Sequence, residues 1–509
     1  MGARGSVTLG KRTAINLFPS DIPGSCFIII STMLSKEKII FIAITVVWLG
    51  LMGLLIERFY VASPVVSITT DTSTLPEAFL TPQWMGIYMN GSKIGYNFTQ
   101  FTQSADGYDL TQGMRMNILV MGFERSIQAD INATLNTNLR LMAFNATVAS
   151  EFDISVSGKV VGNTMRITLD TGSGPEEHSL RLSEQPSLEP AALMSILAEG
   201  RLTPGEKIRI PVIEPTSMTV EDTVIEVLAR EPVSAMGEMH DTFKLRSSFK
   251  GIEIITWLTP KGEILRQESS AGFTLMREGR EEATALGQPS LDMIYQTSVP
   301  FNLELPRETE YLKVEISGIS LKGLQLDGGR QKLNGNVLEI RRESPRVKLD
   351  DTSQFLGPSM TVQSGHPDIK KQADKINDPP ADAETKARRL NDWVFKAIEK
   401  VPVITLPSAT QVLANLRGDC NEHTVLYTAL ARASGIPTRM AAGLVYKDKS
   451  FYYHAWPEVY LGAWVAVDPT FGQFPADASH IRLVIGDLSE QIRLIPSMGK
   501  IELKGIEYR

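Results

Sequence analysis

The sequence predicts an α+β protein with three parts: one N-terminal transmembrane helix, a large antiparallel β domain, and a C-terminal domain that mixes helices and strands. Three observations carry this prediction. An uncharged apolar run covers residues 39–56, apolar and other residues alternate along much of 83–300, and a helix followed by a hairpin stands in 365–509. The chain has 509 residues, too many for one hydrophobic core.

Composition excludes several classes of function. The formal net charge is −7, and no domain shows a basic surplus, so we expect no nucleic-acid partner. The chain has two cysteines, Cys26 and Cys420, which excludes a disulfide framework and a cysteine-rich zinc site. No metal or cofactor site is predicted.

The first element in order is the membrane segment, which reads IIFIAITVVWLGLMGLLI over residues 39–56. Such a helix would be about 27 Å long, close to the ~30 Å hydrocarbon core of a bilayer. Lys36 and Lys38 precede it, which places the N-terminus in the cytoplasm. We therefore expect a single-pass protein of the inner (cytoplasmic) membrane with a periplasmic, or extracytoplasmic, catalytic domain. A cleaved signal peptide is the alternative, although its apolar core is usually only about 7–15 residues long.

Two short segments flank this helix. Residues 1–38 are predicted to be a cytoplasmic leader, and Met33 offers an alternative start that would leave residues 1–32 untranslated. Residues 57–82, whose later part is rich in Ser, Thr and Pro, are predicted to be a linker.

The middle of the chain alternates with the period of a β-strand. Met114, Met116, Ile118 and Val120 are one such series. Residues 83–300 are therefore predicted to form one antiparallel β domain, either open or a sandwich. A small β module and a linker are expected in residues 301–364, before a catalytic domain at 365–509.

A reactive thiol is predicted where the helix of the last domain begins. Asp419 suits an N-cap and Glu422 follows three residues later, as in a capping box, so Cys420 becomes the first helical residue. A helix N-terminus stabilises a thiolate. The backbone N–H of Cys420 lacks an intrahelical partner and could donate to an oxyanion.

A base and its orienting carboxylate are predicted on the hairpin that follows. With a three-residue loop at 460–462, His454 would lie directly opposite Asp468 on the same face. A two-residue loop would separate them, and Pro457 leaves the register open. In this arrangement His454 takes the thiol proton and later protonates the leaving amine, while Asp468 orients the ring. Each residue alone is more often structural, but the three together favour catalysis.

Three stretches resemble the bacterial transglutaminase-like family: GDCNEHTVLYTALARASGIPTRMAAGLVY, FYYHAWPEVY and AWVAVDPTFGQFPADASHI. The resemblance covers residues 375–487 and not the β regions before them. It implies a papain-like α+β core and a Cys-His-Asp triad formed by Cys420, His454 and Asp468.

Neighbouring residues have two interpretations. Glu422 and His423 could line the cleft, but a capping glutamate and a helix-surface histidine are the simpler roles. Asp477 and His480 resemble a recurrent family feature and are expected to close a loop. Gln411 is a weak candidate for a second oxyanion donor. The aromatic residues that either wall a groove or pack in the core are Trp456 and Trp464.

The leading hypothesis is an extracytoplasmic thiol enzyme that acts on amides of a protein or peptide, with the cell envelope as the source of substrate. A thioester would form on Cys420. Water would then complete proteolysis or amide hydrolysis, and an amine would complete transglutamination. The alternative is a non-catalytic envelope scaffold that uses the same fold to bind peptides or proteins. A sensor that signals across the membrane is weaker, because residues 1–38 contain no evident receiving domain.

Overall fold

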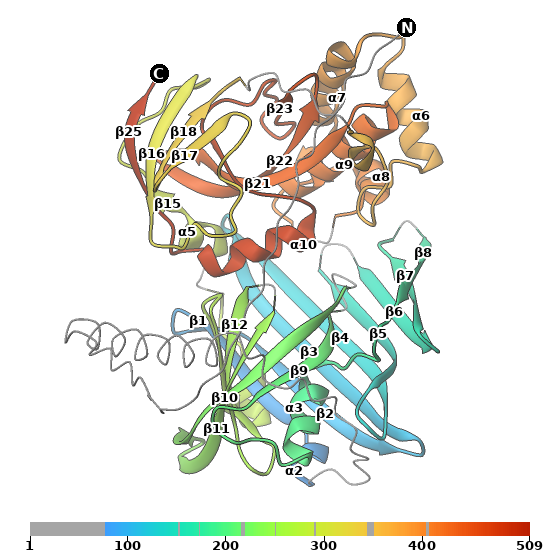
Figure 1. Ribbon diagram of the computed structural model, residues 1–509, viewed down its shortest axis with the longest axis vertical. Helices are drawn as coiled ribbons and strands as arrows, with labels where there is room; N and C mark the ends of the chain where they lie inside the picture. The colour runs from blue at the N-terminus through green and yellow to red at the C-terminus, as the bar shows by residue number, and fades with distance from the viewer. Residues whose placement is uncertain are drawn as a thin grey trace, which may run out of the picture. The chain divides into compact units, whose positions relative to one another are not determined.

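The computed structural model (Figure 1) describes residues 77–509 apart from short gaps. The gaps are residues 151–152, 173, 215–218, 250, 290–291, 344–350 and 404–406.

A single antiparallel sheet dominates the described part of the N-terminal half. Its 14 strands run in the order β8-β7-β6-β5-β4-β3-β2-β1-β14-β13-β12-β11-β10-β9. Neighbours along the chain therefore pair, except β8 and β9, which lie at the two ends of the sheet, and β1 pairs with β14. The strands are β1 (Gln83–Met89), β2 (Ser92–Ser104), β3 (Gly107–Val120), β4 (Phe123–Asn136), β5 (Leu141–Ala149), β6 (Ile154–Val161), β7 (Thr164–Asp170), β8 (Pro175–Arg181), β9 (Lys207–Glu214), β10 (Thr219–Ala235), β11 (Glu238–Phe249), β12 (Ile252–Leu258), β13 (Ile264–Ser269) and β14 (Phe273–Glu278).

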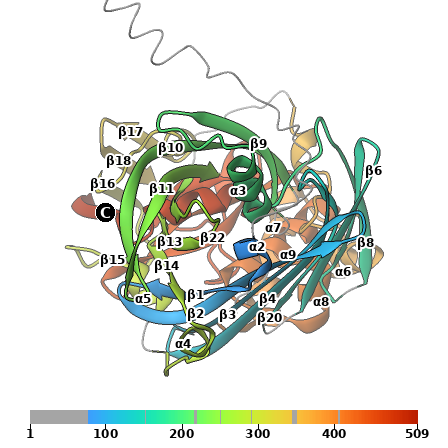
Figure 2. The same ribbon diagram turned by 90° about the horizontal axis from the view of Figure 1, so that it is seen from below.

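The alternation along these strands builds the core of this sheet. Helix α3 (Glu189–Ala198) lies inside its curve (Figure 2), and residues 190–196 are all buried. Leu110 and Leu135 on β3 and β4 join the same apolar cluster as α3. Short helices α2 (Glu77–Leu80), α4 (Arg280–Thr284) and α5 (Met293–Thr297) accompany the sheet in the chain.

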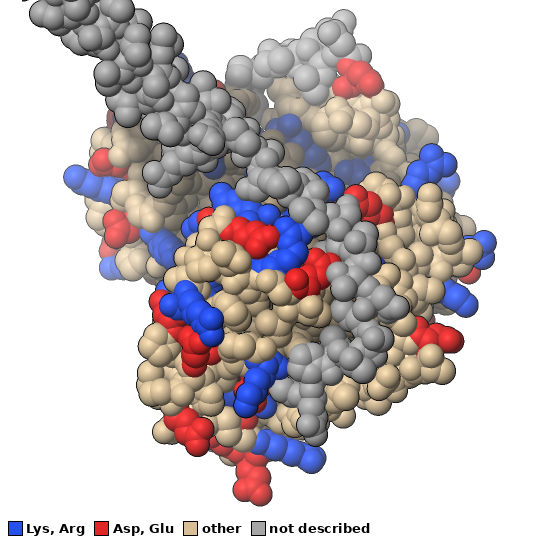
Figure 3. All heavy atoms as spheres, turned by 60° about the horizontal axis from the view of Figure 1, so that its bottom comes forward, with Lys and Arg blue, Asp and Glu red and all other residues tan. Residues whose placement is uncertain are grey.

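Acidic and basic side chains are interspersed on the face shown in Figure 3. Ion pairs join neighbouring strands of the large sheet, such as Arg230 with Asp241 and Arg246 with Glu226. Such pairs lie on solvated faces and suit an antiparallel sheet that has polar residues on one side.

The C-terminal part packs helices against a second sheet of order β15-β22-β21-β24, to which β23 adds through β22. The strands are β15 (Val299–Pro300), β21 (Thr438–Lys447), β22 (Ser450–Tyr460), β23 (Trp464–Ala466) and β24 (His480–Ile485). The helices are η1 (Ser353–Phe355), α6 (Pro367–Ile376), α7 (Ala383–Ala397), α8 (Ala409–Asn415), α9 (Cys420–Ala433), α10 (Leu488–Gln491) and η2 (Ile492–Ser497), and the short strands β19 (Glu399–Lys400) and β20 (Arg417–Gly418) pair in parallel. The central helix α9 is buried from Glu422 to Ala431.

A small sheet of order β17-β18-β16-β25 completes the described chain. It comprises β16 (Tyr311–Ser317), β17 (Gln331–Asn334), β18 (Val337–Arg341) and β25 (Glu502–Tyr508). The domain boundaries expected at residues 301 and 365 stay predictions. Strand pairing nevertheless connects the segments, because β16 pairs with β25 and β15 pairs with β22.

The predicted α+β class, with an N-terminal transmembrane helix, is wrong for this chain. Of the described residues, 48% lie in strands and 19% in helices, so the protein is mostly β. The physical reason is the long run of period-two alternation, which continues through fourteen strands and leaves helices as short inserts outside the C-terminal part.

The expected single-pass location in the inner membrane, with a periplasmic catalytic domain, is also contradicted. Among the described residues, no helix has the length and apolar character needed to cross a bilayer. The longest, α7 (Ala383–Ala397), has 15 residues and carries several charges. The segment on which the expectation rested, residues 39–56, lies outside the described residues, as do the leader 1–38 and residues 57–76 of the linker predicted at 57–82.

Candidate active site

The N-terminus of α9 places Cys420 as the spacing predicts. Asp419 is the N-cap, and its carboxylate accepts a hydrogen bond from the Asn421 N–H at 2.8 Å. Glu422 closes the capping box, because its carboxylate accepts from the Asp419 N–H at 2.8 Å. Glu422 is 2% exposed, so it caps the helix and does not line an open cleft.

The capping leaves one backbone donor of the first helical turn for a substrate. The Asp419 carboxylate accepts from the N–H groups of Asn421 and Glu422, and the Asp419 carbonyl accepts from that of His423 at 3.1 Å. Of the first four N–H groups of α9, Cys420 therefore supplies the one for which the described residues offer no acceptor. This N–H can stabilise an oxyanion that forms beside the Cys420 sulfur.

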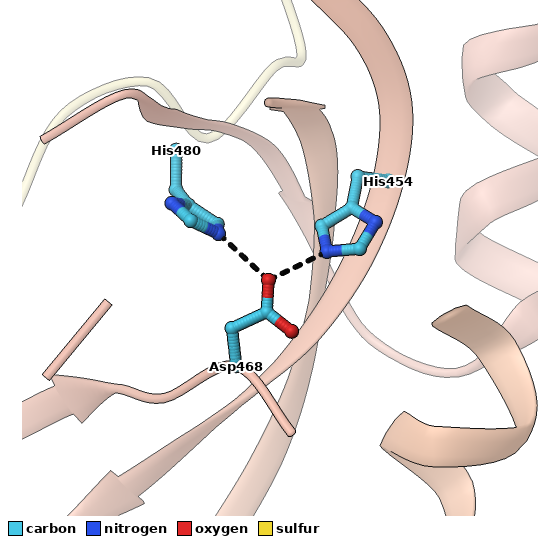
Figure 4. Close-up of side chains that lie close together, drawn as sticks. All are labelled: His454, Asp468 and His480. Atoms are coloured by element: carbon cyan, nitrogen blue, oxygen red, sulfur yellow. Dashed lines mark hydrogen bonds and ion pairs between the residues drawn. The ribbon is translucent and has the colours of Figure 1, made fainter. Parts of the chain in front are cut away.

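His454 on β22 and Asp468 form a buried hydrogen bond (Figure 4). The distance from His454 Nε2 to Asp468 Oδ2 is 2.8 Å, and Asp468 is fully buried. This bond uses Nε2, which leaves Nδ1 as the ring nitrogen for the thiol proton.

The hairpin reaches this contact by a route that differs from the expected one. Tyr460 pairs with Trp464, so the loop is residues 461–463, and β23 already ends at Ala466. Asp468 sits in a turn after β23, where its backbone exchanges hydrogen bonds with Gln473 at 2.9 Å. Pro457 contributes to the irregularity, because its carbonyl accepts from Val467 and it has no N–H to return.

The sulfur of Cys420 lies within hydrogen-bonding reach of the Ala455 backbone, one residue after His454 on β22. The backbone N–H of Ala455 makes a hydrogen bond that stabilises the thiolate of Cys420. Burial raises the pKa of the neighbouring Asp419 carboxyl, and a positive charge on His454 opposes that rise when the ring is protonated. The structure thus brings the start of α9 and the 454–455 segment of β22 together around the thiol.

The thiol keeps its proton in this resting arrangement. Burial raises the pKa of Cys420 well above its usual range, and the negative charges of Asp419, Glu422 and Asp468 add to the effect. The Ala455 N–H opposes them with a smaller effect. The lowering of the Cys420 pKa expected from a helix N-terminus is therefore outweighed.

Asp468 is an ionised carboxylate with every acceptor position in use. Its Oδ2 accepts from His454 at 2.8 Å and from His480 at 2.9 Å, and its Oδ1 accepts from the N–H groups of Thr470 and Phe471 at 2.7 and 3.0 Å. Burial alone raises the pKa of Asp468, but the charges and hydrogen bonds of the two histidines outweigh it and hold that pKa well below its usual range.

His480 has a closer link to the site than a loop-closing role requires. It is fully buried at the start of β24, with Nε2 on Asp468 and Nδ1 3.3 Å from Asp477 Oδ1. The sequence signal was available, since an aspartate and a histidine three residues apart follow the triad aspartate. Sequence reasoning did not connect His480 to Asp468, because the intervening turn could not be placed.

His423 is buried, which corrects the expected helix-surface position. Its side chain has no exposure, its Nδ1 lies 2.6 Å from the Asp419 carbonyl oxygen, and burial lowers its pKa to about 4. Trp456 is also buried and stacks on His454 with ring centroids 6.1 Å apart, so it supports the imidazole instead of walling a groove. Trp464 is half-buried, with the Arg439 guanidinium 4.1 Å above its ring.

Gln411, the weak oxyanion candidate, is buried within α8. The described contacts do not join its amide to Cys420, so its role stays a prediction.

His454, Asp468 and His480 each offer one possible metal-ligand atom within 4.8 Å of the others. Asp468 Oδ2 accepts hydrogen bonds from both Nε2 atoms at 2.8 and 2.9 Å, which requires a proton on each nitrogen. The three side chains therefore satisfy one another through protons.

Comparison with known proteins supports the family resemblance for one part of the chain. Residues 370–469 match the profile of the transglutaminase-like superfamily. This match supports a cysteine-dependent enzyme family at a general level. It includes Cys420, His454 and Asp468 and leaves the fourteen-stranded sheet outside. No curated protein matches the chain.

Several solved structures show limited likeness. A protein of Cytophaga hutchinsonii provisionally named a cysteine protease shares 17% identity over 40% of this chain and 87% of its own, with a TM-score of 0.26. A protein of Brucella abortus from a domain family of unknown function shares 9% identity over 39% of this chain and 94% of its own, with a TM-score of 0.31. A protein of Parabacteroides distasonis provisionally named a protease shares 10% identity over 72% of this chain and 65% of its own, with a TM-score of 0.19. Likenesses of this size carry no argument about function.

Proposed function

We propose that this chain is a cysteine-nucleophile hydrolase or acyltransferase that acts on amide bonds of proteins or peptides. Cys420 is the nucleophile, His454 the general base and acid, and Asp468 the orienting carboxylate. The observation that carries the proposal is the buried hydrogen bond of 2.8 Å between His454 and Asp468, made beside the helix N-terminus that holds Cys420.

Acylation begins with a proton transfer. Because burial and three carboxylates raise the pKa of the Cys420 thiol, the thiolate forms when His454 Nδ1 takes the proton. The sulfur then attacks the amide carbon, and the Cys420 N–H donates to the oxygen that becomes negative. The His454 imidazolium gives its proton to the leaving amine, the carbon–nitrogen bond breaks, and a thioester remains on Cys420.

Deacylation uses the same groups in reverse. His454 takes a proton from water or from an incoming amine, whose oxygen or nitrogen attacks the thioester carbon. The thiolate leaves and regains its proton from His454. Water yields a free acid, and an amine yields a new amide.

One exposed aromatic ring beside the base suggests how substrate is held. Phe471 stacks on His454 with ring centroids 5.1 Å apart and an interplanar angle of 11°, yet its side chain is 39% exposed. Phe395, which is 36% exposed, lies against Gly472. These two rings offer an apolar surface next to the scissile bond, which suits a substrate with an apolar residue there.

The test measures thiol reactivity and acyl transfer in the full chain. Alkylation of Cys420 by iodoacetamide is followed at pH 6–8 by peptide mass spectrometry, in the wild type and in His454→Gln. We expect alkylation in the variant to fall at least about tenfold, since a positioned base contributes roughly 10²–10⁴. A peptide library with and without a primary amine then separates hydrolysis from amide formation, with Cys420→Ala as the blank.

Two outcomes would reject the proposal. One is a Cys420 alkylation rate at pH 6–7 that equals a free model thiol and does not respond to His454→Gln. The other is capture of peptide by Cys420→Ala as fast and as extensively as by the wild type. Either result would favour a peptide-binding scaffold that has the same fold and no nucleophile.

A further inference from the structure

We infer that His480 is a positioning residue: a buried imidazolium that shares Asp468 with His454 and repels the positive charge that the His454 ring gains when it takes the thiol proton. This inference rests on the proposed function. It adds a second imidazole to the site and gives it a task distinct from that of the base.

One oxygen of Asp468 accepts hydrogen bonds from both histidine rings. Asp468 Oδ2 accepts from His454 Nε2 at 2.8 Å and from His480 Nε2 at 2.9 Å (Figure 4). An ionised carboxylate oxygen can only accept, so both ring nitrogens carry hydrogen. The second oxygen of Asp468 is held by two backbone N–H groups, which fixes the carboxylate between the rings.

The other ring nitrogen of His480, Nδ1, faces a second carboxylate, that of Asp477. Its Nδ1 lies 3.3 Å from Asp477 Oδ1, so a carboxylate faces each ring nitrogen of this fully buried residue. Only the doubly protonated ring can donate to both. Burial lowers the pKa of His480, but the hydrogen bonds and charges of Asp468 and Asp477 outweigh it and raise that pKa above its usual range.

The loop that carries Asp477 and His480 is fixed by residues from other parts of the fold. Arg330, which precedes β17 and is 5% exposed, donates to the carbonyls of Ala476 and His480 at 2.6 and 3.4 Å, and also to that of Asp477. The N–H of Ala478 donates to the Thr309 carbonyl at 2.7 Å. The loop that carries Asp477 and His480 is therefore anchored at several points along its backbone.

The other charged groups around the two rings come from three elements. Asp419, Cys420 and His423 belong to the start of α9, and the electrostatic interactions of Asp419 and His423 include His454. Lys400 on β19 interacts with Asp468. Around His480, the cation of Arg330 lies beyond the backbone of the 476–480 loop and acts on Asp477.

The consequence is a repulsion that arises only during catalysis. When His454 takes the thiol proton, two imidazolium rings face one carboxylate, with ring centroids 5.8 Å apart. Two like charges at that distance repel each other, which raises the free energy of the state in which both rings are charged. His480 therefore keeps the Cys420–His454 pair neutral at rest and makes His454 a readier proton donor to the leaving amine.

The test uses His480→Gln, whose side-chain amide can still donate to Asp468 but carries no charge. Removing the charge of His480 stabilises the pair formed by the Cys420 thiolate and the His454 imidazolium, so alkylation of Cys420 at pH 6 should rise about tenfold. Asp477→Asn should act in the same direction, because His480 then loses the carboxylate at Nδ1. A purely structural role would lower alkylation or leave it unchanged.

A second measurement reads the charge directly. The chain has six histidines, so ¹³C labelling at histidine Cε1 of the full chain gives few signals, and the variants assign them. The His480 signal should keep its imidazolium position at pH 7. A neutral His480 at pH 7 overturns the inference, whether or not Cys420 is catalytic.

The two hypotheses fail in different ways. If alkylation of wild-type Cys420 does not respond to His454→Gln, the proposed function fails while the NMR titration still judges His480. If alkylation depends on His454 but does not rise in folded His480→Gln, the inference fails and the proposed function stands. Circular dichroism and thermal melts identify any variant that fails to fold, and the wild-type titration then decides.

Discussion

Lowering the pH from 7 to 5 should loosen the start of α9, because it forces a proton onto His423. The side chain of His423 has no exposure, and its Nδ1 donates to the Asp419 carbonyl at 2.6 Å. Its Nε2 is buried, and the described residues supply no hydrogen-bond partner for it. A proton at Nε2 would therefore place a charged donor where nothing accepts from it.

The magnitude follows from the pKa. Burial lowers the pKa of His423 from 6.5 to about 4 in the folded chain. The unfolded chain binds this proton below about pH 6.5 and the folded chain does not, so the stabilisation is present above pH 6.5 and is lost as the pH falls towards 4. Between pH 7 and pH 5 this linkage removes about 2 kcal/mol from the free energy of opening.

Hydrogen exchange can measure this loss locally. Peptides that cover residues 420–433 would be followed by mass spectrometry at pH 7 and pH 5 and corrected for the intrinsic exchange rate. His423→Asn keeps a donor near the Asp419 carbonyl and cannot titrate, so its opening free energy should change by about 2 kcal/mol less than the wild type. His240→Asn, a substitution on β11, is the matched control and should behave as the wild type. Equal pH dependence in His423→Asn and the wild type would refute the reasoning.

Three further changes follow from the site. Gly418→Ala should destabilise α9 by about 1–2 kcal/mol in urea unfolding, because an added Cβ would overlap the Glu422 side chain and break the capping box; unchanged stability would contradict the contact. Phe471→Ala should lower the turnover of peptides that have an apolar residue next to the scissile bond about tenfold, the effect of losing roughly 1.4 kcal/mol of binding free energy. Phe471→Tyr should keep the turnover of the wild type. Tyr427→Phe should lower the free energy of unfolding by about 1 kcal/mol in the same urea assay, since the Tyr427 hydroxyl donates to the Ala387 carbonyl of α7 at 3.2 Å. An unchanged free energy of unfolding would show that this hydrogen bond does not stabilise the fold.

Local features of the site were predictable because they depend on neighbours in sequence. The capping box of Asp419 and Glu422 is present, and α9 runs from Cys420 to Ala433, where the apolar pattern ends. The contact of His454 with Asp468 was also expected, although the register was not. The irregular turn after β23 decides that register, and its hydrogen bonds join residues that no periodicity relates.

Long-range pairing explains what could not be predicted. The alternation of β3 and β4 predicts strands, but the closure of β1 onto β14 joins segments about two hundred residues apart and depends on how fourteen strands curve together. The anchoring of the His480 loop by Arg330 is a similar case, since the two residues are 150 apart in sequence. Burial of His423 came from packing around α9, which a helix-surface assignment from sequence alone could not include.

The pairing of β25 with β16 has a practical consequence for dissecting the protein. Leu503 and Leu312 both belong to an apolar cluster that also contains Phe451 on β22 and Ile481 on β24. A recombinant fragment that starts at residue 365 would expose this cluster to water and would leave β25 without its partner strand β16. Both changes favour aggregation. A fragment that contains Cys420, His454 and Asp468 should therefore start before Val299, so that it includes β15 and β16.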